Sequence, residues 1–95
     1  MYTAKYEGKE IGRSDNVEKV EGNIYFPKED LNMNFFEKTQ KQTTCPWKGK
    51  ASYYTLHIDD TTVENVAWTY EDPKDAASQI KDHVAFYSDV DVVEE

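Results

Sequence analysis

The stretch Ala51–Ile58 alternates more regularly than any other part of the chain. Tyr54, Leu56 and Ile58 share one parity, and the residues between them share the other. Because successive side chains of a strand point to opposite faces of a sheet, this alternation predicts a β-strand. The next residues, Asp59-Asp60, predict a turn, and residues 62–68 return as a partner strand. The sequence therefore predicts an antiparallel hairpin whose two faces are both partly covered.

Two shorter hairpins are predicted nearer the N-terminus. A glycine stands in each turn, Gly8 in the first and Gly22 in the second. Pro27 ends the last of these strands, because proline cannot donate a hydrogen bond to a sheet. The strand pairs are residues 2–6 with 10–14, and residues 17–20 with 24–26.

The remaining segments are less regular. Residues 28–44 place a few apolar side chains among charged and amide residues, and we expect a long loop or one helical turn there. Asp72-Pro73 is typical of a helix start, because Asp can cap free N–H groups and Pro is preformed for the first helical position. A short α-helix is therefore expected near residues 73–82. A last strand should follow at 83–87, and the acidic tail, residues 89–95, should fray at its end.

Composition restricts the core that these elements can build. The chain has 95 residues, of which 38% are apolar and 14% aromatic. Tyr, Trp and Phe must therefore supply much of the buried area. We predict a single domain over residues 1–95, mostly β, with a small aromatic core.

The charge of the chain is acidic and unevenly distributed. The formal net charge is −8; residues 1–50 carry nine Lys and Arg against eight Asp and Glu, whereas residues 51–95 carry two against eleven. Binding to nucleic acid or to an anionic membrane depends on basic side chains, so neither is expected as a partner. An unknown small molecule or a protein remains as the expected partner, and the acidic second half would suit a basic protein.

The number of cysteines and the hydropathy of the chain indicate the cellular compartment of the protein. Cys45 is the only cysteine and cannot form an internal disulfide, and no N-terminal apolar run resembles a signal peptide. No apolar stretch approaches the roughly 20 residues that cross a bilayer. We therefore expect a cytoplasmic protein.

Several short motifs along the chain together resemble the pattern of a single protein family. They are Gly22-Asn23-x-Tyr25-Phe26-Pro27, Thr44-Cys45-Pro46-Trp47-Lys48-Gly49, Ala51-Ser52-Tyr53-Tyr54, Ala67-Trp68-x-Tyr70, Asp72-Pro73 and Val84-Ala85-Phe86-Tyr87. In these motifs the chain resembles domain-of-unknown-function family 427, over about residues 15–93. The resemblance implies a β-tent-like fold, with two antiparallel sheets meeting along one side and a short helix before the last strands. It implies no established activity.

Many β-tent relatives hold structural zinc through two Cys-x-x-Cys pairs, and this chain departs from that pattern. It has one cysteine and two histidines, His57 and His83, whose spacing does not provide a closed tetrahedral site. We also find neither a Gly-Ser nucleotide loop nor an Asp pair that would hold Mg²⁺ with a triphosphate. The sequence therefore predicts no metal site and no cofactor.

Cys45 has two interpretations. With His57 or His83 within hydrogen-bond distance it could act as a nucleophile, because an imidazole can generate the thiolate. A free cysteine is more commonly a small buried side chain, and Pro46 favours the extended conformation of a strand at Cys45. We favour the packing role.

Residues 38–50 form the only locally basic stretch, with four lysines and no acidic residue. Within it Trp47 and Lys48 stand beside Gly49 and offer a flat ring and an ammonium group. These groups could bind a small anionic or ring-bearing ligand, and we expect Tyr53 and His83 to join them. The alternatives are a Trp in the core, lysines on a solvated face and a histidine that complements the end of a helix.

Four further ring side chains could line such a site or simply fill the core, and we favour the core. They are Tyr53, Trp68, Tyr70 and Tyr87. The function that we predict is accordingly that of a small β-domain binding a ligand near Trp47-Lys48, rather than an enzyme. The rivals are a small enzyme, using Cys45 with a histidine or nucleotidyl transfer, and a protein-interaction scaffold.

Overall fold

The computed structural model describes residues 1–95, and strands make up most of them. Three short 3-10 helices connect some of the strands: η1 (Lys28–Asp30), η2 (Met33–Phe35) and η3 (Asp75–Ile80). The strands are β1 (Tyr2–Tyr6), β2 (Lys9–Ser14), β3 (Glu18–Val20), β4 (Asn23–Pro27), β5 (Phe36–Cys45), β6 (Gly49–Ile58), β7 (Thr61–Thr69), β8 (His83–Phe86) and β9 (Asp91–Glu94).

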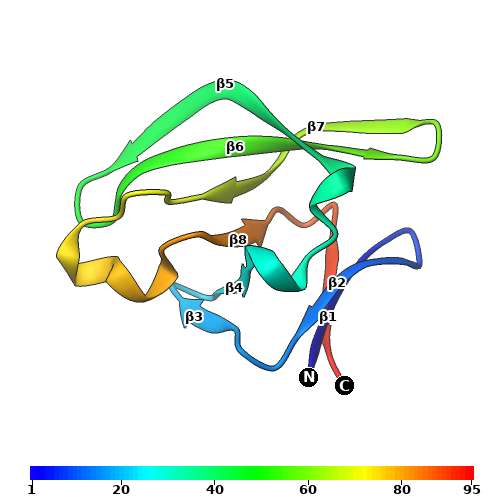
Figure 1. Ribbon diagram of the computed structural model, residues 1–95, viewed down its shortest axis with the longest axis horizontal. Helices are drawn as coiled ribbons and strands as arrows, with labels where there is room; N and C mark the ends of the chain where they lie inside the picture. Colours follow the sequence, from blue (N-terminus) through cyan, green and yellow to red (C-terminus); the bar gives the residue numbers. More distant parts are fainter.

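The strands form two antiparallel sheets, which confirms the predicted fold class. One sheet has the order β2-β1-β9, and the other has the order β3-β4-β8-β7-β6-β5. In Figure 1 the long strands β5, β6 and β7 arch over β3, β4 and β8, and the three-stranded sheet stands beside them with both ends of the chain. No helix in the structure has the length and apolar character needed to cross a membrane.

The three predicted hairpins are confirmed, and the turns of the first two explain why those two form. The two-residue turn between β1 and β2 places Glu7 and Gly8 at φ values of 47° and 85°. The turn between β3 and β4 places Glu21 and Gly22 at 54° and 81°. Positive φ at both central residues is the type I′ geometry, whose twist matches that of the flanking strands.

The prediction of a long loop or one helical turn over residues 28–44 is wrong for residues 36–44, which belong to strand β5, whereas η1 and η2 supply short helical turns before it. β5 spans ten residues and lies at the edge of the six-stranded sheet, with β6 as its only neighbour. Most of its side chains are exposed. An edge strand of this kind buries too little surface to show an apolar alternation, and lysines on an edge discourage pairing with other chains.

The expected α-helix near residues 73–82 is instead the 3-10 helix η3, which spans six residues. Ala77 leaves the helical region at φ −124°, and Lys74, rather than Asp72, occupies the position before the first turn without a side-chain cap. So short a segment cannot recover the cost of starting an α-helix, and packing of Ala77 and Ile80 decides its shape. The C-terminal tail also differs from prediction: β9 pairs with β1.

Both faces of the six-stranded sheet are covered, so the chain has two cores. Successive side chains on β8 show the division, because Val84 joins one core and Ala85 the other. The first core consists of Ala4, Ile11, Phe26, Leu31, Tyr54, Leu56, Ile58, Val66, Ala67, Val84, Phe86 and Val90. The second core consists of Val20, Tyr25, Ala51, Tyr53, Tyr70, Ala77, Ile80 and Ala85, with Cys45 and Trp68 packed against it.

Candidate functional site

The turn between β5 and β6, residues 46–48, is held in place by the segment before η3. The backbone N–H of Lys74 donates to the carbonyl of Lys48 at 2.9 Å, and the Lys74 ammonium donates to the carbonyl of Pro46 at 2.7 Å. Gly49 follows with φ 110°, a conformation that L side chains rarely adopt. The turn is therefore attached at two points to Lys74, the residue before η3.

Two donors in this turn converge on a single carboxylate. The Lys48 ammonium pairs with Oε1 of Glu21, and the Trp47 indole Nε1 donates to Oε2 of the same residue at 3.3 Å. Glu21 comes from the β3–β4 turn, so this contact joins two hairpins. The Lys48 side chain is only 8% exposed, whereas that of Glu21 is 50% exposed. The two charged groups of this ion pair thus differ in exposure, because the cation is nearly buried and the anion is half-exposed.

Aromatic rings surround the Lys48 ammonium. Its nitrogen lies 5.5 Å from the ring centroids of both Trp47 and Tyr70, within the range of cation–π attraction. Burial opposes the charge, but the hydrogen bond to Glu21, together with Tyr25 and Tyr70, raises the pKa of Lys48 above its ordinary value. The hydrogen bond from Lys48, and then the one from Trp47, lowers the pKa of Glu21. Lys48 is therefore charged throughout the neutral range.

Further rings continue from the second core to the surface. The Trp68 indole Nε1 donates to the hydroxyl of Tyr25 at 3.2 Å, and the Tyr87 ring lies 4.7 Å from that of Trp68. Tyr53 is buried, and its hydroxyl lies 3.0 Å from Oγ1 of Thr43. A hydrogen bond with Tyr53, and then burial, raises the pKa of Tyr87 to about 12. The most exposed rings of the chain are those of Trp47 and Tyr87, at 38% and 44%.

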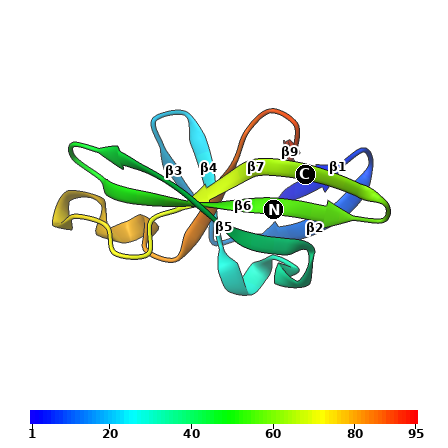
Figure 2. The same cartoon turned by 90° about the horizontal axis from the view of Figure 1, so that it is seen from above.

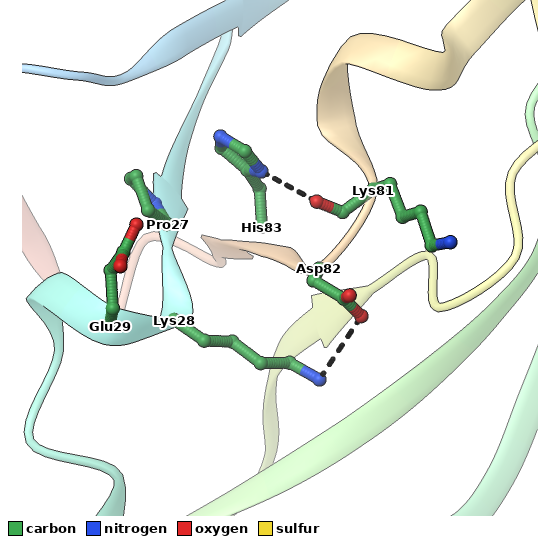
Figure 3. A pocket seen from close by; sticks show the side chains of 6 residues that line it. All are labelled: Pro27, Lys28, Glu29, Lys81, Asp82 and His83. Atoms are coloured by element: carbon green, nitrogen blue, oxygen red, sulfur yellow. Dashed lines mark hydrogen bonds and ion pairs between the residues drawn. The ribbon is translucent and has the colours of Figure 1, made fainter.

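The structure divides the four residues expected at the site into two groups. Trp47 and Lys48 share the Glu21 contact, and Tyr53 lies in the same second core as Tyr70. His83 instead lines an open pocket of about 480 Å³, in which its Nδ1 lies 2.8 Å from the carbonyl of Lys81 (Figure 3). The other residues of that pocket are Pro27, Lys28, Glu29, Lys81 and Asp82.

Neither histidine is hydrogen-bonded to the thiol of Cys45. Cys45 is half-buried against the second core and makes no side-chain hydrogen bond. The Nε2 atom of His57 lies 2.8 Å from the carboxylate of Glu37, while His83 contacts the backbone of Lys81. The thiol therefore has no base within reach. No three side chains among His, Cys, Asp and Glu gather as ligands of a metal ion would.

Glu21 is the residue of this contact that sequence reasoning missed. It stands 27 residues from Lys48, in a hairpin turn where an exposed acidic residue is unremarkable. Only the folding of one hairpin against the other brings its carboxylate to Trp47 and Lys48. The motif that contains Gly22 and Tyr25 marks this hairpin, but it does not include Glu21.

Acid should destabilise the protein partly through Glu21. Because its pKa is lowered from the ordinary value of 4.5 in the folded chain, its contribution to stability is present above that value. The contribution is lost as the pH falls through the folded pKa. We expect the urea midpoint of unfolding to fall between about pH 5 and pH 3. Glu21→Gln should show a shallower fall, and equal slopes for the two proteins would contradict this role.

Comparison with known proteins identifies one family. The profile of the family described as Domain of unknown function (DUF427) matches residues 7–95, which include the turn, the β3–β4 hairpin and all core residues except Ala4. No curated protein matches the chain.

Proposed function

Because the chain belongs to the DUF427 family, whose description assigns no activity, we propose its function from the site itself. This domain binds a small ligand that joins an anionic group to a ring, and the ligand sits at the Trp47-Lys48 turn. The residues that carry the binding are Trp47 and Lys48, with Tyr53 in the second core.

The observation that carries the proposal is the convergence of two donors on the two oxygens of one carboxylate. Lys48 meets Oε1 and Trp47 meets Oε2 of Glu21, so the turn already has the geometry of an anion clamp. Hydrogen bonds from an ammonium to a carboxylate are roughly twice as strong as neutral ones. In a chain of net charge −8, long-range attraction for anions is poor, and such a local clamp is what an anionic ligand needs.

The exposed ring of Trp47 supports the second half of the proposal. Trp47 presents 38% of its surface to solvent while its indole N–H points to the carboxylate. One side chain can thus donate to an anion and stack on a ring of the same ligand. Since Cys45 has no base within reach, the geometry favours binding over nucleophilic catalysis.

Calorimetric titration with three compounds tests the proposal. Adenosine 5′-monophosphate carries both a ring and an anion, adenosine lacks the anion, and inorganic phosphate lacks the ring. We expect the monophosphate to bind more tightly than either of the others. If none of the three saturates the protein below millimolar concentration, the proposal is wrong.

Substitutions in the β5–β6 hairpin test whether the side chains of the turn bind the ligand. Lys48→Met should weaken binding of the monophosphate by about tenfold or more, the loss expected for one charge-assisted hydrogen bond. Lys50→Met is the matched control, because Lys50 is exposed, belongs to the same hairpin and makes no ion pair with a carboxylate. Equal losses in the two variants would show that overall charge, and not the clamp, governs binding.

A further inference from the structure

We propose that Glu21 is an internal ligand of the Trp47-Lys48 clamp, so that it must leave before an external anion can bind. This inference rests on the proposed function and adds a form of self-inhibition to it. The carboxylate of Glu21 occupies both donors that the clamp offers. A ligand anion that is to accept from the same two donors must therefore displace Glu21.

The donor side of the contact is fixed. Lys74 holds the turn through two hydrogen bonds, one to the carbonyl of Lys48 and one to that of Pro46. The Lys48 side chain is 8% exposed and lies beside the buried ring of Tyr70. The backbone of the turn is thus held by bonds that do not involve Glu21, which is what a preorganised site requires.

The acceptor side can move. Glu21 occupies an exposed two-residue turn, and half of its side chain is in solvent. The neighbours that anchor the hairpin, Val20 and Tyr25, are buried in the second core. Rotation of the Glu21 side chain can therefore open the contact while the body of the hairpin stays in place.

Side chains alone connect the two hairpins at this point. Figure 2 shows the β3–β4 hairpin and the β5–β6 turn projecting as separate loops. No backbone hydrogen bond joins residues 20–23 to residues 46–49. Release of Glu21 consequently costs the two side-chain contacts and leaves both sheets intact.

Competition from a tethered carboxylate lowers the apparent affinity for any external anion. If the clamp is open in only a fraction of molecules, the apparent dissociation constant rises in inverse proportion to that fraction. Closure in about nine molecules of ten would weaken binding about tenfold. Removal of the Glu21 charge should restore the intrinsic affinity.

The test compares Glu21→Gln with Glu64→Gln in titrations with adenosine 5′-monophosphate. Each variant removes one negative charge, but Glu64 is exposed on β7 and has no ion-pair partner. We expect Glu21→Gln to bind about tenfold or more tightly than the wild type, and Glu64→Gln to match the wild type. If the wild type binds and Glu21→Gln binds no better, Glu21 is not a competitor, although the proposed function stands. If no protein binds, the proposed function itself has failed.

A second measurement on the unmodified protein avoids any effect of the substitution on folding. The carboxyl carbon of Glu21 should shift in the NMR spectrum as the monophosphate is added, because the carboxylate moves from two donors into water. The carboxyl carbon of Glu64 should stay unchanged. Saturable binding without a shift at Glu21 would overturn the proposal.

Discussion

Phe26→Ala should lower the free energy of unfolding by about 3–5 kcal/mol, the usual cost of deleting a fully buried phenyl ring. Phe26 is 0% exposed on β4, and its ring meets that of Phe86 edge-on at 5.8 Å between centroids. Its backbone pairs with Val84 of β8, at the point where the β3–β4 hairpin joins the six-stranded sheet. The cavity would thus open under the hairpin that carries Glu21.

Urea unfolding followed by circular dichroism measures this loss. Since a domain of this size has about 5–15 kcal/mol of stability in all, the variant should unfold at a much lower urea concentration. Phe35→Ala is the matched control, because Phe35 is only partly buried beside the same core and should cost clearly less. A loss below about 1 kcal/mol for Phe26→Ala would mean that the site collapses around the missing ring.

Gly12→Ala should also be strongly destabilising, by about 2–3 kcal/mol, because it overpacks a close contact. Gly12 of β2 forms an isolated bridge with Leu31. An added Cβ would lie 2.3 Å from Cδ2 of Leu31, and 3.0 Å from both the Leu31 Cα and the carbonyl oxygen of Asp30. The side chain of Leu31 can move, but the two backbone atoms can do so only if the bridge between β2 and the segment after η1 widens.

A double-mutant cycle with Leu31→Ala distinguishes this clash from a general intolerance of alanine. If the Leu31 side chain is part of the obstacle, the double variant should lose less stability than the sum of the two single variants. Thermal or urea unfolding of the four proteins gives the coupling. If the two losses of stability are strictly additive, the added methyl group does not contact the side chain of Leu31.

The donors of the candidate site were predictable, and their acceptor was not. Trp47 and Lys48 stand out in the sequence because residues 38–50 contain lysines and no acid. Nothing in the sequence indicates that an acidic residue from another hairpin neutralises Lys48. The same limit applies to His83, which shares the sequence features of a site residue but lines a pocket to which Trp47 and Lys48 do not contribute.

Local physical chemistry determined the hairpins, and the tertiary structure decided the rest. Glycines that accept positive φ specify β1–β2 and β3–β4, and the period of two in residues 51–58 with the turn at Asp59-Asp60 specifies β6–β7, in each case from neighbouring residues alone. β5 becomes a strand only because β6 offers it an edge, and η3 takes 3-10 geometry because Ala77 and Ile80 must pack on the second core. The contact of Glu21 with Lys48 likewise depends on how two hairpins meet. Each of these features is stabilised by partners distant in the chain, and a local pattern carries no information about them.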